Sequence, residues 1–312
     1  MSLYTTYVTD DAMFLALTGY TQTEFAQLIP EFEKAFLARM RTHCLNGKPR
    51  TQRAYVTYTN SPLPQIEDKL FFILCYFKTY PIAAVQAALF RMKQPKAQQW
   101  IDCLTPVLEQ TLHNRHAMPA RKMADLELDA AASVYFHDGT ECPIVRPSDA
   151  TQQRTYYSGK QKDHTVKYEV LNTLDCKISF LSTMAEGKKH DKKLADECAY
   201  RLPVGSRLVQ DTGFQGFTVT DVHILQPKKK PRGKELTDLD KLCNRWISRL
   251  RMRAEHAIGG VKRCRIAKDR LRNWKTRFRE RVFAICCGLH NFRLNFRPWQ
   301  YPPLQLSLFV EF

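Results

Sequence analysis

The chain has 312 residues, enough for two domains, and its 44% hydrophobic and 25% charged residues are typical of a globular protein. Its 48 lysines and arginines outnumber its 31 aspartates and glutamates by 17, so nucleic acid is the first expected partner and an acidic membrane surface the second. The longest unbroken apolar run, residues 70–77, is far shorter than the roughly 20 residues that span a bilayer, so we expect no membrane segment.

The ten cysteines are scattered along the chain. They form no CxxC pair, and only Cys286 and Cys287 are adjacent. The first residues lack the basic start and the apolar stretch of a secretory signal. We therefore expect reduced, mostly buried thiols and no zinc site.

Residues 1–125 are predicted to be helical. Apolar residues recur at helical spacing in the first part, where one stripe is formed by Phe25, Leu28, Phe32 and Phe36. A polar connection with two prolines, residues 58–65, precedes a second helical group. The two short helices expected after Pro81 suggest a helix-turn-helix whose second helix, near Lys96 to Leu104, could enter a DNA major groove. Any small helical bundle would give the same pattern.

The pattern changes to strands after Met123. The β-rich runs are residues 133–138, 164–172, 177–184, 207–211 and 222–227. A polar loop is expected over 151–163 and a helix over 191–202, and long helices follow from Glu235. This order predicts an α/β core with a mixed sheet, over residues 126–312, preceded by an all-α domain over residues 1–125. We expect the tail 301–312 to pack on this core as an extension.

Two carboxylates stand at the ends of predicted strands. Asp138 ends an apolar run and precedes Gly139, and Asp211 ends another and precedes Thr212 and Gly213. The carboxyl ends of strands are where an α/β sheet opens toward its ligands. A local explanation exists for each, because Asp-Gly is a common turn dipeptide and an aspartate can cap a turn or helix.

A third carboxylate, Glu255, lies in a predicted helix that is otherwise rich in arginine and lysine. At helical spacing Arg251, Glu255 and Lys262 share one face. The simple alternative is a surface ion pair between Glu255 and Arg251. If Glu255 instead joins Asp138 and Asp211, three carboxylates offer hard oxygen ligands that favour Mg²⁺ or Mn²⁺, and the two cations would lie beside a phosphate. Two such ions can activate a nucleophile and stabilise the leaving oxygen of a phosphodiester.

Five motifs in order give the chain a family resemblance. FHDGTECPI, YSGKQKDHTVK, GKKHD, LVQDTGFQG and RMRAEHAIGGVKR resemble the catalytic domain of bacterial insertion-sequence transposases of the IS5 type. These enzymes belong to the DDE superfamily and have a ribonuclease H-like core, in which helices flank a mixed sheet. The resemblance covers residues 134 to about 295. The helical N-terminal part is similar to the helix-turn-helix domain that commonly precedes that core.

The resemblance implies a set of site residues. Asp138, Asp211 and Glu255 would be the three acidic metal ligands, separated by 211 − 138 = 73 and 255 − 211 = 44 residues, so no large domain is inserted before the glutamate. Arg251 and Lys262 fit the family signature around that glutamate, whereas its tyrosine position holds Ser248. His190 and Asp191 match a His-Asp pair of relatives and are expected near the site, although local capping of a helix would also explain them.

Basic segments bracket the proposed metal site in the sequence. Between Arg251 and Arg281 twelve lysines and arginines face three acids, and a second run occupies residues 228–234. Such runs are often only solvated surface, but their position here favours contacts to DNA phosphates and binding that weakens with salt. The expected phosphate contacts are Lys160, Lys162, Lys167, Lys228, Lys229, Lys230, Arg251, Lys262 and Arg263.

The resemblance implies a DNA transposase with two Mg²⁺ or Mn²⁺ ions. It would bind terminal inverted repeats, cleave phosphodiesters at the element ends and join the 3′ hydroxyls to target DNA, as a homodimer on double-stranded DNA. It would work in the bacterial cytoplasm, on the nucleoid when bound to DNA. The spacing of the acids indicates only a metal nuclease. Two alternatives stay open: a domesticated DNA-binding protein that no longer cuts, and a ribonuclease H-like nuclease acting on RNA or hybrids.

Overall fold

The computed structural model describes residues 3–51, 53–58, 60–126, 134–273 and 275–300. Within these ranges no helix combines the length and the apolar character needed to cross a membrane. All ten cysteines are free thiols, and half-buried or buried except Cys243. The predicted packing of the tail 301–312 falls outside the described residues.

The N-terminal part is helical, as predicted. Its helices are α1 (Leu3–Tyr7), α2 (Asp11–Thr18), α3 (Gln22–Ala26), α4 (Ile29–Thr42), α5 (Ile66–Thr79), α6 (Ala83–Leu89) and α7 (Gln94–Asn114). The residues of the predicted stripe are all buried, but they lie on two helices: Phe25 belongs to α3, and Leu28, Phe32 and Phe36 lie at the start and along one face of α4. Thr21 and Glu24 form a capping box that fixes the start of α3.

The predicted helix-turn-helix corresponds to α6 and α7. A turn over residues 90–93 joins them, and α7 is a single helix of 21 residues. Trp100, Ile101 and Leu104 on α7 are buried in the helical bundle, so any DNA contact would use the opposite side of that segment. Contact with a major groove stays a prediction.

A mixed sheet forms the second half of the molecule and confirms the predicted fold class. Its strands are β1 (Val134–Pro143), β2 (Tyr157–Ser158), β3 (Asp163–Thr173), β4 (Ile178–Leu181), β5 (Ala185–Glu186), β6 (Arg207–Val209) and β7 (His223–Leu225). The described strands follow the order β2-β3-β1-β6-β7, with β4 and β5 also pairing with β3. β1 is antiparallel to β3 and parallel to β6, which is parallel to β7.

Two local predictions were wrong. The strand β1 does not end at Asp138 but continues to Pro143, paired with β3 from Asp138 opposite Val170 to Pro143 opposite Thr165. The long ladder with β3 holds the Asp-Gly dipeptide extended, where its local preference is a turn. The expected polar loop over 151–163 contains the helix α8 (Ala150–Tyr156), whose Asp149 side chain accepts from the Gln152 N–H. Because α8 has no buried face, it lacks the apolar spacing that would have revealed it.

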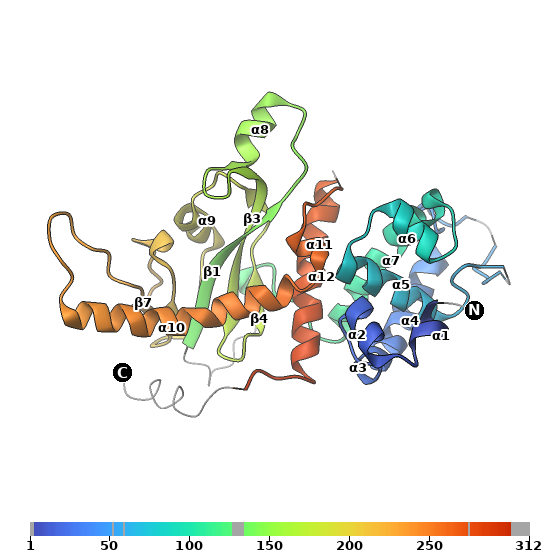
Figure 1. Cartoon of the computed structure of the whole chain (residues 1–312), viewed down its shortest axis with the longest axis horizontal. Coiled ribbons are helices and arrows are strands. Elements are labelled where there is room, and N and C mark those ends of the chain that lie inside the picture. The colour runs from blue at the N-terminus through green and yellow to red at the C-terminus, as the bar shows by residue number, and fades with distance from the viewer. Residues whose placement is uncertain (1–2, 52, 59, 127–133, 274, 301–312) are drawn as a thin grey trace.

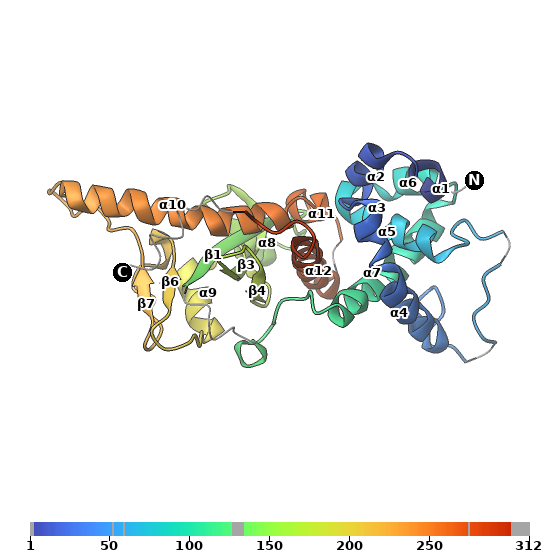
Figure 2. The same cartoon turned by 90° about the horizontal axis from the view of Figure 1, so that it is seen from below.

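Helices cover the sheet and join it to the N-terminal part. They are α9 (Asp191–Cys198), α10 (Asp238–Val261), α11 (Arg265–Lys268) and α12 (Thr276–Leu294), with short 3₁₀ turns η1 (Met123–Asp125) and η2 (Thr212–Phe214). Figure 2 shows α10 running along the sheet, against which it packs through Ile247, Leu250 and Ala254. Ala254 immediately precedes Glu255, so this packing sets the position of the glutamate.

The helix α12 lies between the sheet and the N-terminal helices (Figure 1). On one side Phe283 stacks on Tyr168 of β3, with ring centroids 4.6 Å apart. On the other side Phe292 meets the Tyr20 ring at 5.8 Å. One hydrophobic cluster therefore runs from the N-terminal helices through α12 to the sheet, across the predicted domain boundary near residue 125.

A close helix crossing completes this arrangement. At Gly260 of α10 an added Cβ would lie 2.3 Å from the His290 ring of α12, so only glycine permits this approach. The neighbouring Asn291 side chain accepts from the Ile178 N–H at 2.8 Å and donates to the carbonyls of Ile178 and Ala117. These contacts fix α10 relative to the sheet.

Candidate active site

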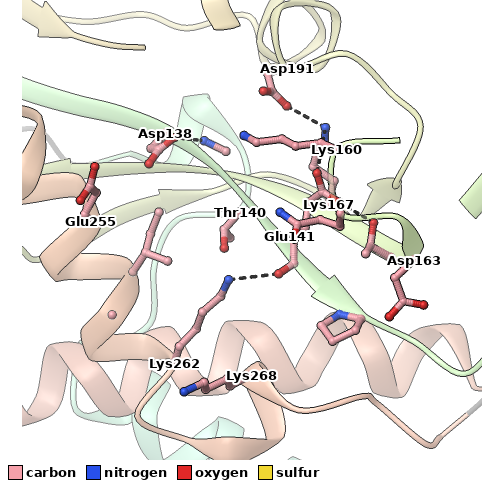
Figure 3. A pocket seen from close by; sticks show the side chains of 16 residues that line it. Asp138, Thr140, Glu141, Lys160, Asp163, Lys167, Asp191, Glu255, Lys262 and Lys268 are labelled. Atoms are coloured by element: carbon pink, nitrogen blue, oxygen red, sulfur yellow. Dashed lines mark hydrogen bonds and ion pairs between the residues drawn. The ribbon is translucent and has the colours of Figure 1, made fainter. Parts of the chain in front are cut away.

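A cavity of about 540 Å³ opens between β1 and the C-terminal half of α10. Figure 3 shows Asp138 and Glu255 on one side of it and several lysines on the other. The acids come from β1, β3, α9 and α10, and the lysines come from the loop between β2 and β3 (the 158–164 loop), β3, the end of α10 and α11. Segments far apart in the chain therefore meet in one polar cavity.

Asp138 projects from the middle of β1 into this cavity. The Gly139 N–H donates to its Oδ1 at 2.8 Å. Burial raises the pKa of the Asp138 carboxyl above its usual range, opposed by the nearby Arg251 charge and reinforced by Asp211. The carboxylate is thus held in a poorly solvated place, where its charge would be relieved by a cation.

Asp211 follows β6 by two residues and begins the 3₁₀ turn η2. Its Oδ1 accepts from the Thr212 N–H at 2.6 Å, and its carbonyl accepts from the Gln226 side chain. Arg251 of α10 places Nη1 3.2 Å from Asp211 Oδ1. Arg251, predicted as a phosphate contact, therefore forms an ion pair with a predicted metal ligand in this structure.

Glu255 lies one turn of α10 beyond Arg251 and lines the cavity together with Asp138 (Figure 3). The structure thus brings Asp138 and Glu255 to one cavity and connects Asp211 to the same helix through Arg251. In the described ranges, no three His, Cys, Asp or Glu side chains are grouped closely enough to hold a metal ion. The three carboxylates are therefore near one another in the fold, but their oxygens are not close enough to bind one metal ion together.

The lysines of the cavity differ in how they are held. Lys167 Nζ contacts the Lys189 carbonyl at 2.8 Å, Asp191 Oδ1 at 2.7 Å and Glu141 Oε1 at 3.6 Å, so its ammonium is fully engaged by the protein. Lys262, which caps the end of α10, donates to the Glu141 carbonyl at 3.1 Å. Lys160 also lines the cavity.

Asp191 and His190 are placed differently. Asp191 begins α9 and lines the cavity, and its carboxylate lies beside the glycines that follow both aspartates. A Cβ added to Gly139 would be 3.4 Å from one of its oxygens, and a Cβ added to Gly213 would be 3.2 Å from the other. His190 is exposed and lies outside the described lining of the cavity.

The other predicted DNA contacts lie outside this cavity. Lys162 is exposed in the 158–164 loop. Lys228 pairs with Asp240 at 2.9 Å and Lys230 pairs with Glu235, whereas Lys229 is exposed in the same loop. Arg263 points toward the N-terminal helices and donates to the Gly19 carbonyl at 3.3 Å.

Sequence reasoning missed several residues of the cavity. Glu141 accepts from the Thr165 hydroxyl at 2.6 Å and lies between Lys167 and Lys262. The predicted turn at Asp138 hid Glu141, because it removed the second half of β1 from the strand. Lys268, on the short helix α11, also lines the cavity, and no spacing in the sequence distinguishes it from the other cations nearby.

A buried polar pair lies behind Asp138. His137 Nε2 and Glu169 Oε2 are 2.9 Å apart, and both side chains are fully buried. Burial lowers the pKa of His137 to about 4 and raises the pKa of Glu169 well above its usual range, with Asp191 and Asp138 adding to the latter shift. Both shifts favour the uncharged forms, a neutral imidazole and a protonated carboxyl, joined by a hydrogen bond.

The chain is similar in sequence to known proteins. Residues 137–291 match the family described as DDE superfamily endonuclease. Over 233 residues the chain is 27% identical to a probable transposase for insertion sequence element IS702 of Microchaete diplosiphon, covering 73% of this chain and 81% of that protein. Over 207 residues it is 24% identical to a putative transposase for insertion sequence element IS112 of Streptomyces albus G, covering 65% and 72%. No solved structure gives a significant match.

The matched range contains the positions of Asp138, Asp211 and Glu255. It also begins and ends within the sheet and α12, the elements that hold the cavity together. Residues 137–291 form a domain of the DDE superfamily of endonucleases, and the chain is similar to transposases of insertion sequences.

Proposed function

We propose that the chain is a DNA transposase that binds the terminal inverted repeats of an insertion sequence, cleaves a phosphodiester at each end and joins the freed 3′ hydroxyl to target DNA. One observation carries the proposal: Asp138 and Glu255 share a cavity with lysines from three other segments. Carboxylates on one side suit metal ions, and cations on the other suit the phosphates of a strand. The related transposases support the same activity.

Asp138, Asp211 and Glu255 are the proposed ligands of Mg²⁺ or Mn²⁺, with two ions in the working enzyme. Their oxygen donors suit hard divalent ions, and the poorly solvated Asp138 carboxylate would gain from a cation. Bound ions would supply Lewis acidity toward the phosphodiester. Arg251 neutralises Asp211 in the structure and would give up this contact when a metal binds.

The cations define a path for DNA. Lys262, Lys160 and Lys268 face the cavity and are proposed to contact phosphates at the cleaved bond, with Lys162 and Lys229 contacting the flanks. Phosphate contacts orient the duplex and carry no sequence information, so α6 and α7 are the proposed readers of the inverted repeats. We also propose a homodimer on DNA, since two ends must be handled together, and action on the nucleoid in the cytoplasm.

The test uses a duplex with the element's own ends, identified as short inverted repeats flanking the gene. With Mg²⁺ the unaltered chain should nick this duplex, Glu255→Gln should bind but not nick, and Glu235→Gln should behave as unaltered. Glu235 is the matched control because it is an exposed glutamate paired with Lys230 outside the cavity. Binding with no nick by the unaltered chain would mean a non-cutting DNA-binding protein. Faster cleavage of an RNA–DNA hybrid would refute the proposed substrate.

A further inference from the structure

A second cluster of cations lies away from the catalytic cavity, where the N-terminal helices meet the ends of α10 and α12. Lys78 comes from α5, Arg263 follows α10, Arg293 belongs to α12 and Arg297 follows it. In the described part of the chain, Glu24 is the one carboxylate paired with this group, through Arg297 at 2.5 Å. The cluster thus holds four cations against one carboxylate.

The protein leaves part of this positive charge without a partner. Arg263 donates to the Gly19 carbonyl at 3.3 Å, and Lys78 donates to the Arg263 carbonyl at 3.2 Å. Among the described residues, the Arg293 side chain has no hydrogen-bond acceptor or ion-pair partner, and its buried Nε is unsatisfied. Arg263 Nη1 is buried and unsatisfied as well. A polar group removed from water in this way is costly unless something binds it.

Mutual repulsion adds to that cost. Burial, followed by the charges of Arg263 and Arg297, lowers the pKa of Arg293 to about 10. Burial likewise lowers the pKa of Arg263 and the pKa of Lys78. The three groups would all be stabilised by negative charge placed between them.

The space between them has the size of one atom. A cavity of about 20 Å³ is lined by Lys78, Arg263 and Arg293, together with Gly19, Gly260 and Cys264. A site needs roughly 10–15 Å³ of this kind of volume to hold one water molecule. The cavity therefore accepts a monatomic anion and is too small for a phosphate group.

We infer that this cavity is a halide-sized anion site that ties the N-terminal helices to the catalytic domain. Gly19 and Lys78 line it from the N-terminal side, whereas Arg263 and Arg293 line it from the ends of α10 and α12. The ion relieves the repulsion among cations that the fold brings together from both halves. The inference concerns the junction of the two halves and holds whether or not the enzyme cuts DNA.

Thermal unfolding of the full chain tests the site, with sodium gluconate replaced by sodium chloride at constant ionic strength. Chloride should raise the melting temperature by about 2–4 °C, the shift for roughly 1 kcal/mol, and the rise should saturate. Arg293→Met should abolish this rise, and Lys78→Met should weaken it. Arg201→Met, at an exposed arginine far along the chain from the cluster, should keep it. In gluconate, Arg293→Met should melt no lower than the unaltered chain, because it removes a repelled charge.

Three results would overturn the inference. One is a melting temperature that does not change with chloride at constant ionic strength. Another is a rise in melting temperature with chloride that is equal in Arg293→Met and in the unaltered chain. A rise with phosphate as large as the rise with chloride would have the same meaning, because both would show general screening of charge. The third concerns Cys264, whose thiol pKa is lowered by a hydrogen bond from Cys286 and by Lys78 and Arg263. A chloride effect that is absent in the unaltered chain and appears in Cys264→Ser would assign the counter-charge to that thiolate.

Discussion

At the scale of single residues, Asp138 combines a proposed catalytic role with a cost in stability. A carboxyl whose pKa is raised in the folded state stabilises the fold when protonated, and this contribution is lost as pH rises through the raised value. Asparagine resembles the protonated form and can still accept from the Gly139 N–H. Asp138→Asn should therefore raise stability at neutral pH by about 0.5–2 kcal/mol while cleavage falls on the order of 10²-fold or more.

Chemical denaturation without metal, together with a nicking assay, measures both effects of Asp138→Asn. The gain in stability should shrink toward low pH, where the unaltered carboxyl is also protonated. A variant that is less stable than the unaltered chain at neutral pH would contradict the assigned environment.

The buried pair of His137 and Glu169 gives a pH-dependent prediction. Because the Glu169 pKa is raised in the fold, the unaltered chain loses stability as pH rises from the ordinary carboxyl range through the raised pKa. Glu169→Gln cannot ionise, so its stability relative to the unaltered chain should increase as pH rises above the ordinary carboxyl range. Glu169→Ala leaves a void and an unpaired His137 nitrogen and should cost about 2–4 kcal/mol. Melting temperatures measured as pH rises test both, and parallel curves for Gln and the unaltered chain would be incompatible with a protonated Glu169.

Residues that belong to a sequence motif could be predicted from the sequence, whereas residues whose role depends on their neighbours in the fold could not. Asp138 and Glu255 were predicted from motif and position, and they do line one cavity. The contact between Arg251 and Asp211 could not be predicted, because it depends on how α10 lies across the end of β6. Glu141 was missed for a related reason, since its neighbours are set by the β1–β3 register.

At the scale of elements, the crossing of α10 and α12 depends on Gly260. An added methyl group would lie 2.3 Å from His290, so Gly260→Ala must push the helices apart and should cost about 1–3 kcal/mol. Gly259 is the matched control, because a Cβ there meets nothing within 4 Å. Gly259→Ala should be neutral or stabilise by up to about 1 kcal/mol through helix propensity. Denaturant midpoints measure both, and equal effects of the two changes would contradict the described crossing.

Elements with a strong apolar pattern were predictable, and elements set by pairing were not. The helix α10 and the strands β3 and β6 appear where their apolar spacing places them. The second half of β1 and the helix α8 are polar, so tertiary pairing with β3 and a local Asp149 cap determine them instead. The same limit applies to the cavity, because Lys160 reaches it from the loop that follows α8.

At the scale of the whole molecule, the surplus of 17 positive charges predicts DNA binding that depends strongly on salt. If at least six phosphates are contacted, affinity should fall about 10³-fold or more between 50 and 200 mM salt. Lys160→Met and Lys268→Met should each reduce the slope of log Kd against log salt by about one. Lys192→Met should leave it unchanged, because Lys192 is already paired with Asp196 at 2.7 Å. Fluorescence anisotropy at several salt concentrations measures the slopes, and a larger effect of Lys192 would contradict the proposed DNA path.

The position of α12 has a consequence for dissecting this protein. Its Phe283 side covers the sheet and its Phe292 side covers the N-terminal helices, so each half supplies a wall for the other. If residues 126–312 were expressed by themselves, the apolar face of α12 around Phe292 would be exposed to solvent. Such a fragment should aggregate or require detergent. If the N-terminal half rotates on a bound duplex, the catalytic sheet should rotate with it as part of one rigid body.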